Sequence, residues 1–143
     1  EEFPVSEIVA EEIEKARPLL SGKPVELVLR QDADFSLHAP PRVLSVLLGN
    51  LLRNACHYTD AGTVTVTLRR GSIDITDTGV GMSADELAKV FEPFFRAGDR
   101  RKDGQGIGLS IVRRLSERDG WPVVLDSERG HGTTATIRIP SAS

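Results

Sequence analysis

The chain has 143 residues, a mass of 15.6 kDa and a formal net charge of −3, with 39% hydrophobic and 27% charged residues. This size and balance are typical of one globular domain and exclude a disordered chain, and the slightly acidic charge excludes the basic surface of a typical nucleic-acid-binding protein. A single cysteine, Cys56, excludes an internal disulfide and a cysteine-based zinc site, and no apolar run is long enough to cross a membrane. We therefore expect residues 1–143 to form one soluble, cytoplasmic domain that contacts neither nucleic acid nor membrane.

The first part of the chain alternates helix and strand patterns. Apolar residues recur at helical spacing over residues 4–20, and a turn at 21–24 separates this predicted helix from predicted strands at 25–29 and 35–37. Two prolines then open a helix predicted over 42–57, and its broad apolar stripe indicates that it is largely buried.

The second part of the chain begins with period-two alternation. Residues 63–69 and 73–77 flank a short turn and predict a β-hairpin, and Ser83 and Glu86 have the capping-box spacing that opens a short helix. The whole order predicts an α+β two-layer sandwich, with a mixed, mostly antiparallel sheet of about five strands covered on one face by about three helices. The remaining predicted elements are a long loop over 91–108, a helix from about 107 to 115, and strands at 121–125 and 133–139.

Asp77 stands out in the predicted hairpin. It is in phase with Ile73 and Ile75, so the pleat directs its carboxylate toward the core, where a charge needs partners. Gly79 and Gly81 follow directly and permit backbone geometry that a side chain would forbid. Taken alone, this pattern favours a turn aspartate satisfied by local backbone amides over a functional carboxylate.

Two further groups of residues carry chemistry. Gly104, Gly106 and Gly108 precede a predicted helix, where converging N–H groups and the positive helix end suit a phosphate, although the position after a loop differs from the dinucleotide-binding fold. Asn50 and Asn54 are four residues apart and therefore share one helix face. They are either structural amides that cap a neighbouring loop or oxygen ligands for a Mg²⁺ ion already held by nucleotide phosphates.

Five motifs follow one another along the chain: Asn50-x-x-x-Asn54-Ala55, Asp77-x-Gly79-x-Gly81, Phe91-Glu92-Pro93-Phe94-Phe95-Arg96, Gly104-x-Gly106-x-Gly108-Leu109 and Gly130-x-Gly132-Thr133. In this order they closely resemble the N, G1, F, G2 and G3 boxes of the sensor histidine kinases. The resemblance covers residues 4–140. It implies the ATP-binding catalytic domain, an α/β sandwich shared with gyrase, heat-shock chaperones and mismatch-repair ATPases, with a long ATP lid over about 91–106.

The resemblance also implies a role for each motif residue. Asp77 would accept a hydrogen bond from the adenine amino group, supported by Thr133 directly or through water. Asn54, with Asn50, would hold Mg²⁺ against the phosphates of ATP. The other implied nucleotide contacts are His57, Tyr58, Gly79, Gly81, Met82, Arg96, Gly104, Gly106, Gly108 and Leu109.

The sequence departs from the family pattern at His57, where many members carry Lys or Arg. A neutral imidazole donates one hydrogen bond but carries no charge above its ordinary pKa of about 6.5. His57 either contacts phosphate or faces solvent at the helix end. Of the four cations in the predicted lid, we expect at most one to contact phosphate: Arg96, Arg100, Arg101 and Lys102.

The activity implied is phosphoryl transfer rather than hydrolysis. ATP-hydrolysing members of the fold resemble Glu-x-x-x-Asn, with a glutamate that activates water, whereas this chain has Asn50 four residues before Asn54. An amide cannot act as a base. Two alternatives stay open: a serine kinase of the type that regulates sigma factors, and a degenerate module that binds nucleotide or a partner without chemistry.

The implied phosphate acceptor is a histidine on a separate dimerisation domain. His38, His57 and His131 lack the context of an acceptor box, and residues 1–4 resemble the linker that follows the acceptor helices. We therefore expect a monomeric fragment of a longer sensor kinase, one that cannot phosphorylate itself alone. The parent is expected to signal to a response regulator. Both an inner-membrane sensor and a parent without a membrane span fit these residues.

Overall fold

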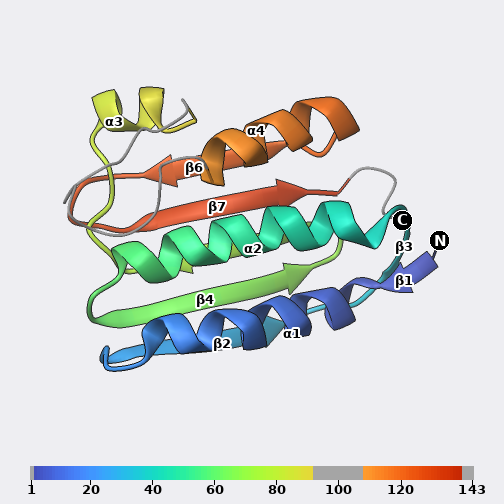
Figure 1. The fold of residues 1–143 in the computed structure, drawn as a ribbon, viewed down its shortest axis with the longest axis horizontal. Helices are drawn as coiled ribbons and strands as arrows, with labels where there is room; N and C mark the ends of the chain where they lie inside the picture. Colours follow the sequence, from blue (N-terminus) through green and yellow to red (C-terminus); the bar gives the residue numbers. More distant parts are fainter. Residues whose placement is uncertain (1, 92–107, 140–143) are drawn as a thin grey trace.

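The computed structural model describes residues 2–91 and 108–139, and its centre is a five-stranded sheet (Figure 1). β2 and β4 are parallel, and the other three neighbouring pairs are antiparallel, as expected for a mixed, mostly antiparallel sheet. The predicted β-hairpin is confirmed as β4 and β5. Across the sheet the strands are β2 (Val25–Gln31), β4 (Gly62–Arg69), β5 (Ser72–Asp77), β7 (Thr133–Arg138) and β6 (Val123–Ser127).

Three long helices cover one face of this sheet, with α2 (Pro41–Tyr58) lying between α1 (Val5–Ala16) and α4 (Gly108–Asp119) (Figure 1). The fourth helix, α3 (Ala84–Lys89), is short and starts at the expected capping box: the Ser83 hydroxyl accepts from the Glu86 amide, and the Glu86 carboxylate accepts from the Ser83 amide. The α+β two-layer sandwich is therefore confirmed, with one more short helix than the three that cover the sheet.

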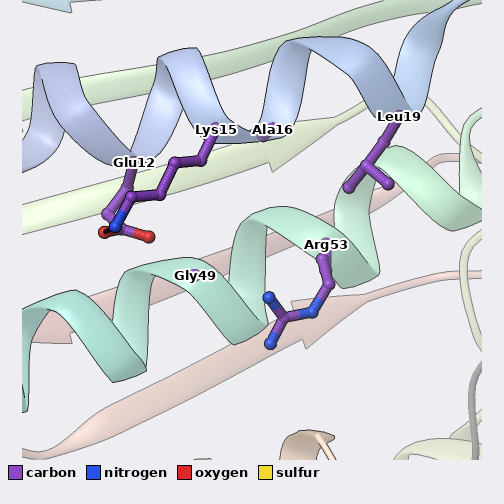
Figure 2. A pocket seen from close by; sticks show the side chains of 6 residues that line it. All are labelled: Glu12, Lys15, Ala16, Leu19, Gly49 and Arg53. Carbon is purple, nitrogen blue, oxygen red and sulfur yellow. Dashed lines mark hydrogen bonds and ion pairs between the residues drawn. The ribbon is translucent and has the colours of Figure 1, made fainter.

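The seam between α1 and α2 holds a buried carboxylate. Glu12 is 6% exposed, and its Oε2 accepts hydrogen bonds from Lys15 Nζ and Ser45 Oγ, both at 3.0 Å. Gly49 leaves room for this carboxylate, since a Cβ there would lie 2.9 Å from Glu12 Oε1. A groove of about 260 Å³ opens beside these groups, and Figure 2 shows its lining: Glu12, Lys15, Ala16, Leu19, Gly49 and Arg53.

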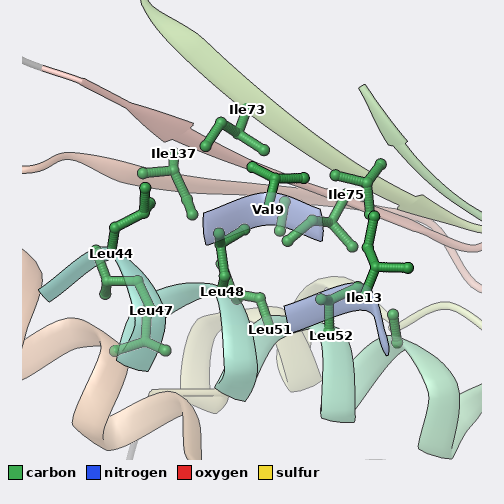
Figure 3. Close-up of a cluster of buried hydrophobic side chains, with 14 of the residues drawn as sticks. Val9, Ile13, Leu44, Leu47, Leu48, Leu51, Leu52, Ile73, Ile75 and Ile137 are labelled. Atoms are coloured by element: carbon green, nitrogen blue, oxygen red, sulfur yellow. The ribbon is translucent and has the colours of Figure 1, made fainter. Parts of the chain in front are cut away.

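The hydrophobic core lies between the helices and the sheet (Figure 3). The apolar stripe of α2 meets the inward-facing residues of β4, β5 and β7, and α1 closes one side. Burying each of these aliphatic side chains stabilises the fold by roughly 1.5–3 kcal/mol. Core residues that are at most 2% exposed include Val9, Ile13, Leu44, Leu47, Leu48, Leu52, Ile73, Ile75 and Ile137.

Two predicted elements in the N-terminal part of the chain differ from the expectation, namely the strand at 35–37 and the helix over 4–20. The predicted strand at 35–37 is confirmed as β3 (Ser36–His38), but it pairs with β1 (Glu2–Pro4) in a separate two-stranded sheet. The predicted helix over 4–20 becomes a 3₁₀-helix at η1 (Arg17–Leu20). Pro18 has no amide hydrogen to donate into the α-helical ladder, which explains the change.

Lys23 caps the C-terminal end of α2. Its ammonium donates to the carbonyl oxygens of Cys56, His57 and Thr59 at 2.9, 3.4 and 3.2 Å, and these carbonyls have no helical partners of their own. The cation also complements the negative end of the helix dipole. The interaction holds the last turn of α2 against the loop before β2.

No helix in the described part of the chain has both the length and the hydropathy that spanning a bilayer requires.

Candidate functional site

A row of three polar side chains crosses the sheet at the end of β5. Asp77 lies directly opposite Thr133 on β7, and Thr133 lies opposite Ser127 on β6. Residues opposite each other on neighbouring strands point to the same face, so all three face the helices at the edge of the apolar core. We call Asp77, Thr133 and Ser127 the polar row.

Asp77 is buried as its period-two position predicts. Its side chain is 6% exposed, and its Oδ1 accepts hydrogen bonds from the backbone amides of Gly79 at 2.9 Å and Thr133 at 3.3 Å. Oδ2 accepts none from residues 2–91 or 108–139. Burial raises the pKa of this carboxyl, and the two amides oppose the rise. The local amides expected of a turn aspartate are therefore present, and they leave one carboxylate oxygen open.

The loop after β5 is held close to two other segments by its glycines. A Cβ on Gly79 would lie 2.4 Å from the carbonyl oxygen of Tyr58, and a Cβ on Gly81 would lie 2.1 Å from that of Glu128. Gly81 also has a φ of +70°, which side chains with a Cβ rarely adopt. Both motif glycines therefore have a packing role, and they place the buried Met82 beside the polar row.

Ser127 joins this loop to the polar row, and the sequence argument did not identify it. Its Oγ accepts from the Met82 amide at 2.8 Å, donates to the Gly132 carbonyl at 3.0 Å and lies 2.8 Å from Thr133 Oγ1. Period two with Val123 and Leu125 was the available signal, but the strand was predicted to end at residue 125.

Asn50 and Asn54 lie on α2 and differ in what they contact. Asn50 is buried, its Nδ2 donates to the Val46 carbonyl, and its Oδ1 accepts from Arg53 Nη2, both at 2.8 Å. The half-buried Asn54 makes no side-chain hydrogen bond within the described ranges. Among these residues there is also no group of three His, Cys, Asp or Glu side chains that could hold a metal.

His57 and Tyr58 form the last turn of α2 and are both half-buried. Their rings meet edge to face, with centroids 5.0 Å apart. The Tyr58 carbonyl accepts from the Val80 amide at 3.4 Å, so the end of α2 and the loop after Asp77 lie against each other. The neighbouring Cys56 is fully buried, as expected of a packed side chain, and burial raises the pKa of its thiol.

The start of α4 at Gly108 agrees with the predicted helix after the glycine motif, and Leu109 is buried in the core. Phe91, the first residue of the predicted lid, contacts Arg113 of α4, whose guanidinium carbon lies 5.7 Å from the ring centroid. The other lid residues lie outside the described residues: Arg96, Arg100, Arg101, Lys102, Gly104 and Gly106.

Sequence comparison finds relatives among the sensor histidine kinases. The chain is 36% identical over 132 residues to the sensor histidine kinase RcsC of Escherichia coli, covering 86% of this chain and 14% of that protein. It is 37% identical over 114 residues to the histidine protein kinase DivJ of Caulobacter vibrioides, covering 75% of this chain and 19% of DivJ. The chain thus spans less than a fifth of the length of each of these two relatives.

Solved structures show the same fold. The mycobacterial sensor histidine kinase MprB superposes with a TM-score of 0.81 at 26% identity, covering 98% of this chain and 96% of that one. Full-length ShkA in complex with AMPPNP superposes with a TM-score of 0.83 at 29% identity, covering 97% of this chain and 30% of ShkA. The model of the histidine kinase-, DNA gyrase B- and HSP90-like ATPases matches residues 39–143, and the chain belongs to this family.

Proposed function

We propose that this domain binds Mg²⁺-ATP and donates the γ-phosphate to a histidine on a separate dimerisation and phosphoacceptor domain, upstream of a response regulator. The observation that carries the proposal is the carboxylate of Asp77, buried at the edge of the core with one oxygen open and Thr133 directly opposite. Its place in the ordered motifs of a family of ATPases supports the same proposal.

The adenine end of the nucleotide is proposed to lie against the polar row and the loop after β5. Oδ2 of Asp77 is an acceptor at the edge of an apolar core, so it suits the amino group of a flat, largely apolar base. Met82 and Tyr58 would line the base, and the packing roles of Gly79 and Gly81 would hold the loop beside it. The related ShkA has been solved in complex with AMPPNP, which supports nucleotide binding as the function.

The phosphate end is proposed to lie between α2 and the start of α4. Gly108 opens α4, where free N–H groups and the helix dipole favour phosphate, and Gly104, Gly106 and one of the lid cations, such as Arg96, would complete the cradle. His57, in the last turn of α2, would donate one hydrogen bond to a phosphate from the side opposite α4. In this arrangement Leu109 is a packing residue rather than a direct contact.

A magnesium ion fits the residues present only as an ion carried by the phosphates. The described residues offer neutral amides rather than a carboxylate cluster, and Mg²⁺ commonly keeps substrate phosphates among its ligands. Asn54 would hold it, whereas the Asn50 oxygen already accepts from Arg53, whose positive charge would oppose a metal ion at the same oxygen. When bound, the ion would neutralise phosphate charge during transfer.

Transfer to a partner histidine fits better than hydrolysis. Asn50 and Asn54 are amides and cannot remove a proton from water, and phosphoryl transfer depends mainly on positioning and charge neutralisation. Because the whole relatives are much longer than this chain, the acceptor domain, the response regulator and a membrane-anchored, cytoplasmically facing parent are parts of the proposal.

The test has two stages. Calorimetric titration with Mg²⁺-ATP and Mg²⁺-AMPPNP should show saturable binding to the isolated, monomeric chain; an absence of heat at millimolar nucleotide would contradict the proposal. Labelled ATP mixed with this chain and the parent kinase's acceptor domain should then give acid-labile phosphohistidine. Acid-stable phosphoserine on a partner would instead support the serine-kinase alternative, and binding without transfer would support the degenerate module.

A further inference from the structure

The hydroxyl of Ser127 contacts three polar groups but has only one proton to donate. It has one proton and two lone pairs, and three polar groups surround it: the Met82 amide at 2.8 Å, the Gly132 carbonyl at 3.0 Å and Thr133 Oγ1 at 2.8 Å. The amide can only donate and the carbonyl can only accept. One lone pair of Ser127 is therefore taken by Met82, and the remaining contacts decide where its proton goes.

Only one arrangement satisfies all three contacts. If Ser127 donates to Gly132, its second lone pair accepts the proton of Thr133, and each short contact contains one hydrogen. If Ser127 donated to Thr133 instead, the contact between Ser127 Oγ and the Gly132 carbonyl would place two oxygens 3.0 Å apart without a proton between them. The Gly132 carbonyl would then keep only its longer hydrogen bond from the Glu128 amide, at 3.4 Å. A buried acceptor pair of this kind costs free energy, so the first arrangement is favoured.

We infer that Ser127 is a specificity-determining residue, because it takes the proton of Thr133 and thereby makes the polar row a pure acceptor toward the base. The inference rests on the proposed function. Thr133 Oγ1 then presents only lone pairs, and the ionised Asp77 likewise only accepts. A purine with a donor at position 6 is accepted, and one with an oxygen acceptor there is rejected.

The same polarity would hold if a water lay between the base and the row. A water that donates to both Asp77 and Thr133 uses both of its protons, and it can then only accept from the base. The 6-amino group of adenine satisfies either arrangement, whereas the 6-oxygen of hypoxanthine or guanine meets lone pairs in both. Ser127 thus acts on the base through Thr133, as a positioning residue without direct contact.

The experiment compares Mg²⁺-ADP with Mg²⁺-IDP, because their bases differ only around position 6. The ratio of the two dissociation constants is measured by calorimetry for the wild-type chain and for S127A. In S127A the Thr133 hydroxyl can turn its proton toward the base, so the preference for ADP should fall about tenfold, mainly through tighter IDP binding. A general loosening of the loop would weaken both nucleotides and leave the ratio unchanged.

Two further variants make the test independent of how well S127A folds. S127T keeps the hydroxyl and should keep the wild-type ratio. T133V removes an acceptor that cannot donate, so it should weaken ADP while leaving IDP unchanged or tighter; a loss of IDP affinity would show that Thr133 donates and would overturn the inference. In T133V the added S127A change should no longer alter the ratio.

The outcomes separate the two proposals. If the wild-type chain binds neither nucleotide, the proposed function fails. If it binds ADP but S127A keeps the full ADP preference, the proposed function stands and the role of Ser127 is wrong.

Discussion

Glu12 and Asp77 are both carboxylates that are only 6% exposed, but their partners differ. Glu12, in the seam between α1 and α2, accepts from the ammonium of Lys15 (Figure 2). It also accepts from the hydroxyl of Ser45. Asp77 accepts only from two backbone amides, and among the described residues it has no cationic partner. A lysine on the same helix compensates the first charge, whereas only dipoles compensate the second.

This difference separates a structural carboxylate from one suited to a ligand. Glu12 has its charge balanced by Lys15 of the same helix, and its hydrogen bond from Ser45 joins α1 to α2. Asp77 has amide donors on only one of its two oxygens, so the loss of hydration on burial is only partly compensated. The raised pKa of this carboxyl reflects that incomplete compensation. Perturbed groups of this kind are concentrated at functional sites, which agrees with the position of Asp77 in the family motif.

The largest expected effect is on stability, and it contrasts Gly81, in the loop after Asp77, with Gly49, which lies beside Glu12. G81A would force a Cβ to 2.1 Å from the Glu128 carbonyl at a φ of +70°, so it should lower the free energy of unfolding by about 2–4 kcal/mol. G49A meets only the far ends of two long side chains, Glu12 and Arg53, and gains helix propensity, so its change should stay within about 1 kcal/mol. Urea unfolding measures both; similar losses would mean that the loop after β5 is not tightly held.

The next effect contrasts the carboxylates themselves. D77N removes a charged acceptor, so nucleotide affinity should fall by about 1–3 kcal/mol, or roughly 5- to 150-fold, in ADP titrations. E12Q should leave this affinity within about twofold, because Glu12 is compensated inside the α1–α2 seam. If both variants bound ADP like the wild type, Asp77 would have no place in the pocket.

D77N should also separate binding from stability. Asparagine keeps an oxygen for the two amides and removes the charge that burial disfavours. The free energy of unfolding at neutral pH should therefore rise even as binding weakens. Thermal unfolding of the nucleotide-free chain checks this, and a clear loss of stability would show that the Asp77 charge stabilises the fold.

The pH dependence of Asp77 has a definite sign. Because its pKa is raised in the fold, the folded state binds more protons than the unfolded one between the ordinary carboxyl pKa and the raised value. The free energy of unfolding contributed by this group therefore falls as pH rises through that window. ADP affinity should change in the opposite direction and rise as Asp77 ionises.

The pH dependence of ADP affinity also distinguishes Asp77 from Glu12. ADP affinity measured between about pH 4.5 and pH 8 should weaken at the acid end in the wild type and in E12Q, and it should be flatter in D77N. An unchanged slope in D77N would assign the acid-side loss to other groups.

The smallest expected effect concerns the two asparagines. N54A should weaken Mg²⁺-dependent nucleotide affinity by about 1 kcal/mol and leave the affinity in EDTA nearly unchanged. N50A should act more on stability, because Asn50 is buried and its amide bonds Val46 and Arg53. Titrations with and without Mg²⁺ measure the difference, and equal losses in N54A under both conditions would contradict metal ligation.

Much of the site was predictable because its signals are local. Period two identified the inward direction of Asp77, the apolar stripe of α2 identified a buried helix, and Ser83 and Glu86 identified the start of α3. The order of the five motifs indicated the family. Each of these signals involves residues that are close in sequence, so the backbone geometry of one element decides them.

Most of the missed features involve partners far apart in the chain. Arg53 was missed for a different reason: its bond to Asn50 is local, but an exposed arginine on a helix gives no sign of which neighbour it contacts. Ser127 contacts Met82 across 45 residues, and Lys23 reaches the end of α2 across more than 30. β1 is three residues long and pairs with β3, which no period can reveal.

The sequence by itself determined most of the elements, their order, the inward carboxylate and the family motifs, because periodicity and spacing are properties of consecutive residues. Only the tertiary structure decided that Asp77, Thr133 and Ser127 share one row, because strand register depends on how side chains pack across the sheet. It also decided that Glu12 meets Lys15 and Ser45 while Asp77 meets only amides. That contrast, which no stretch of sequence contains, is what makes one buried acid structural and the other suited to a ligand.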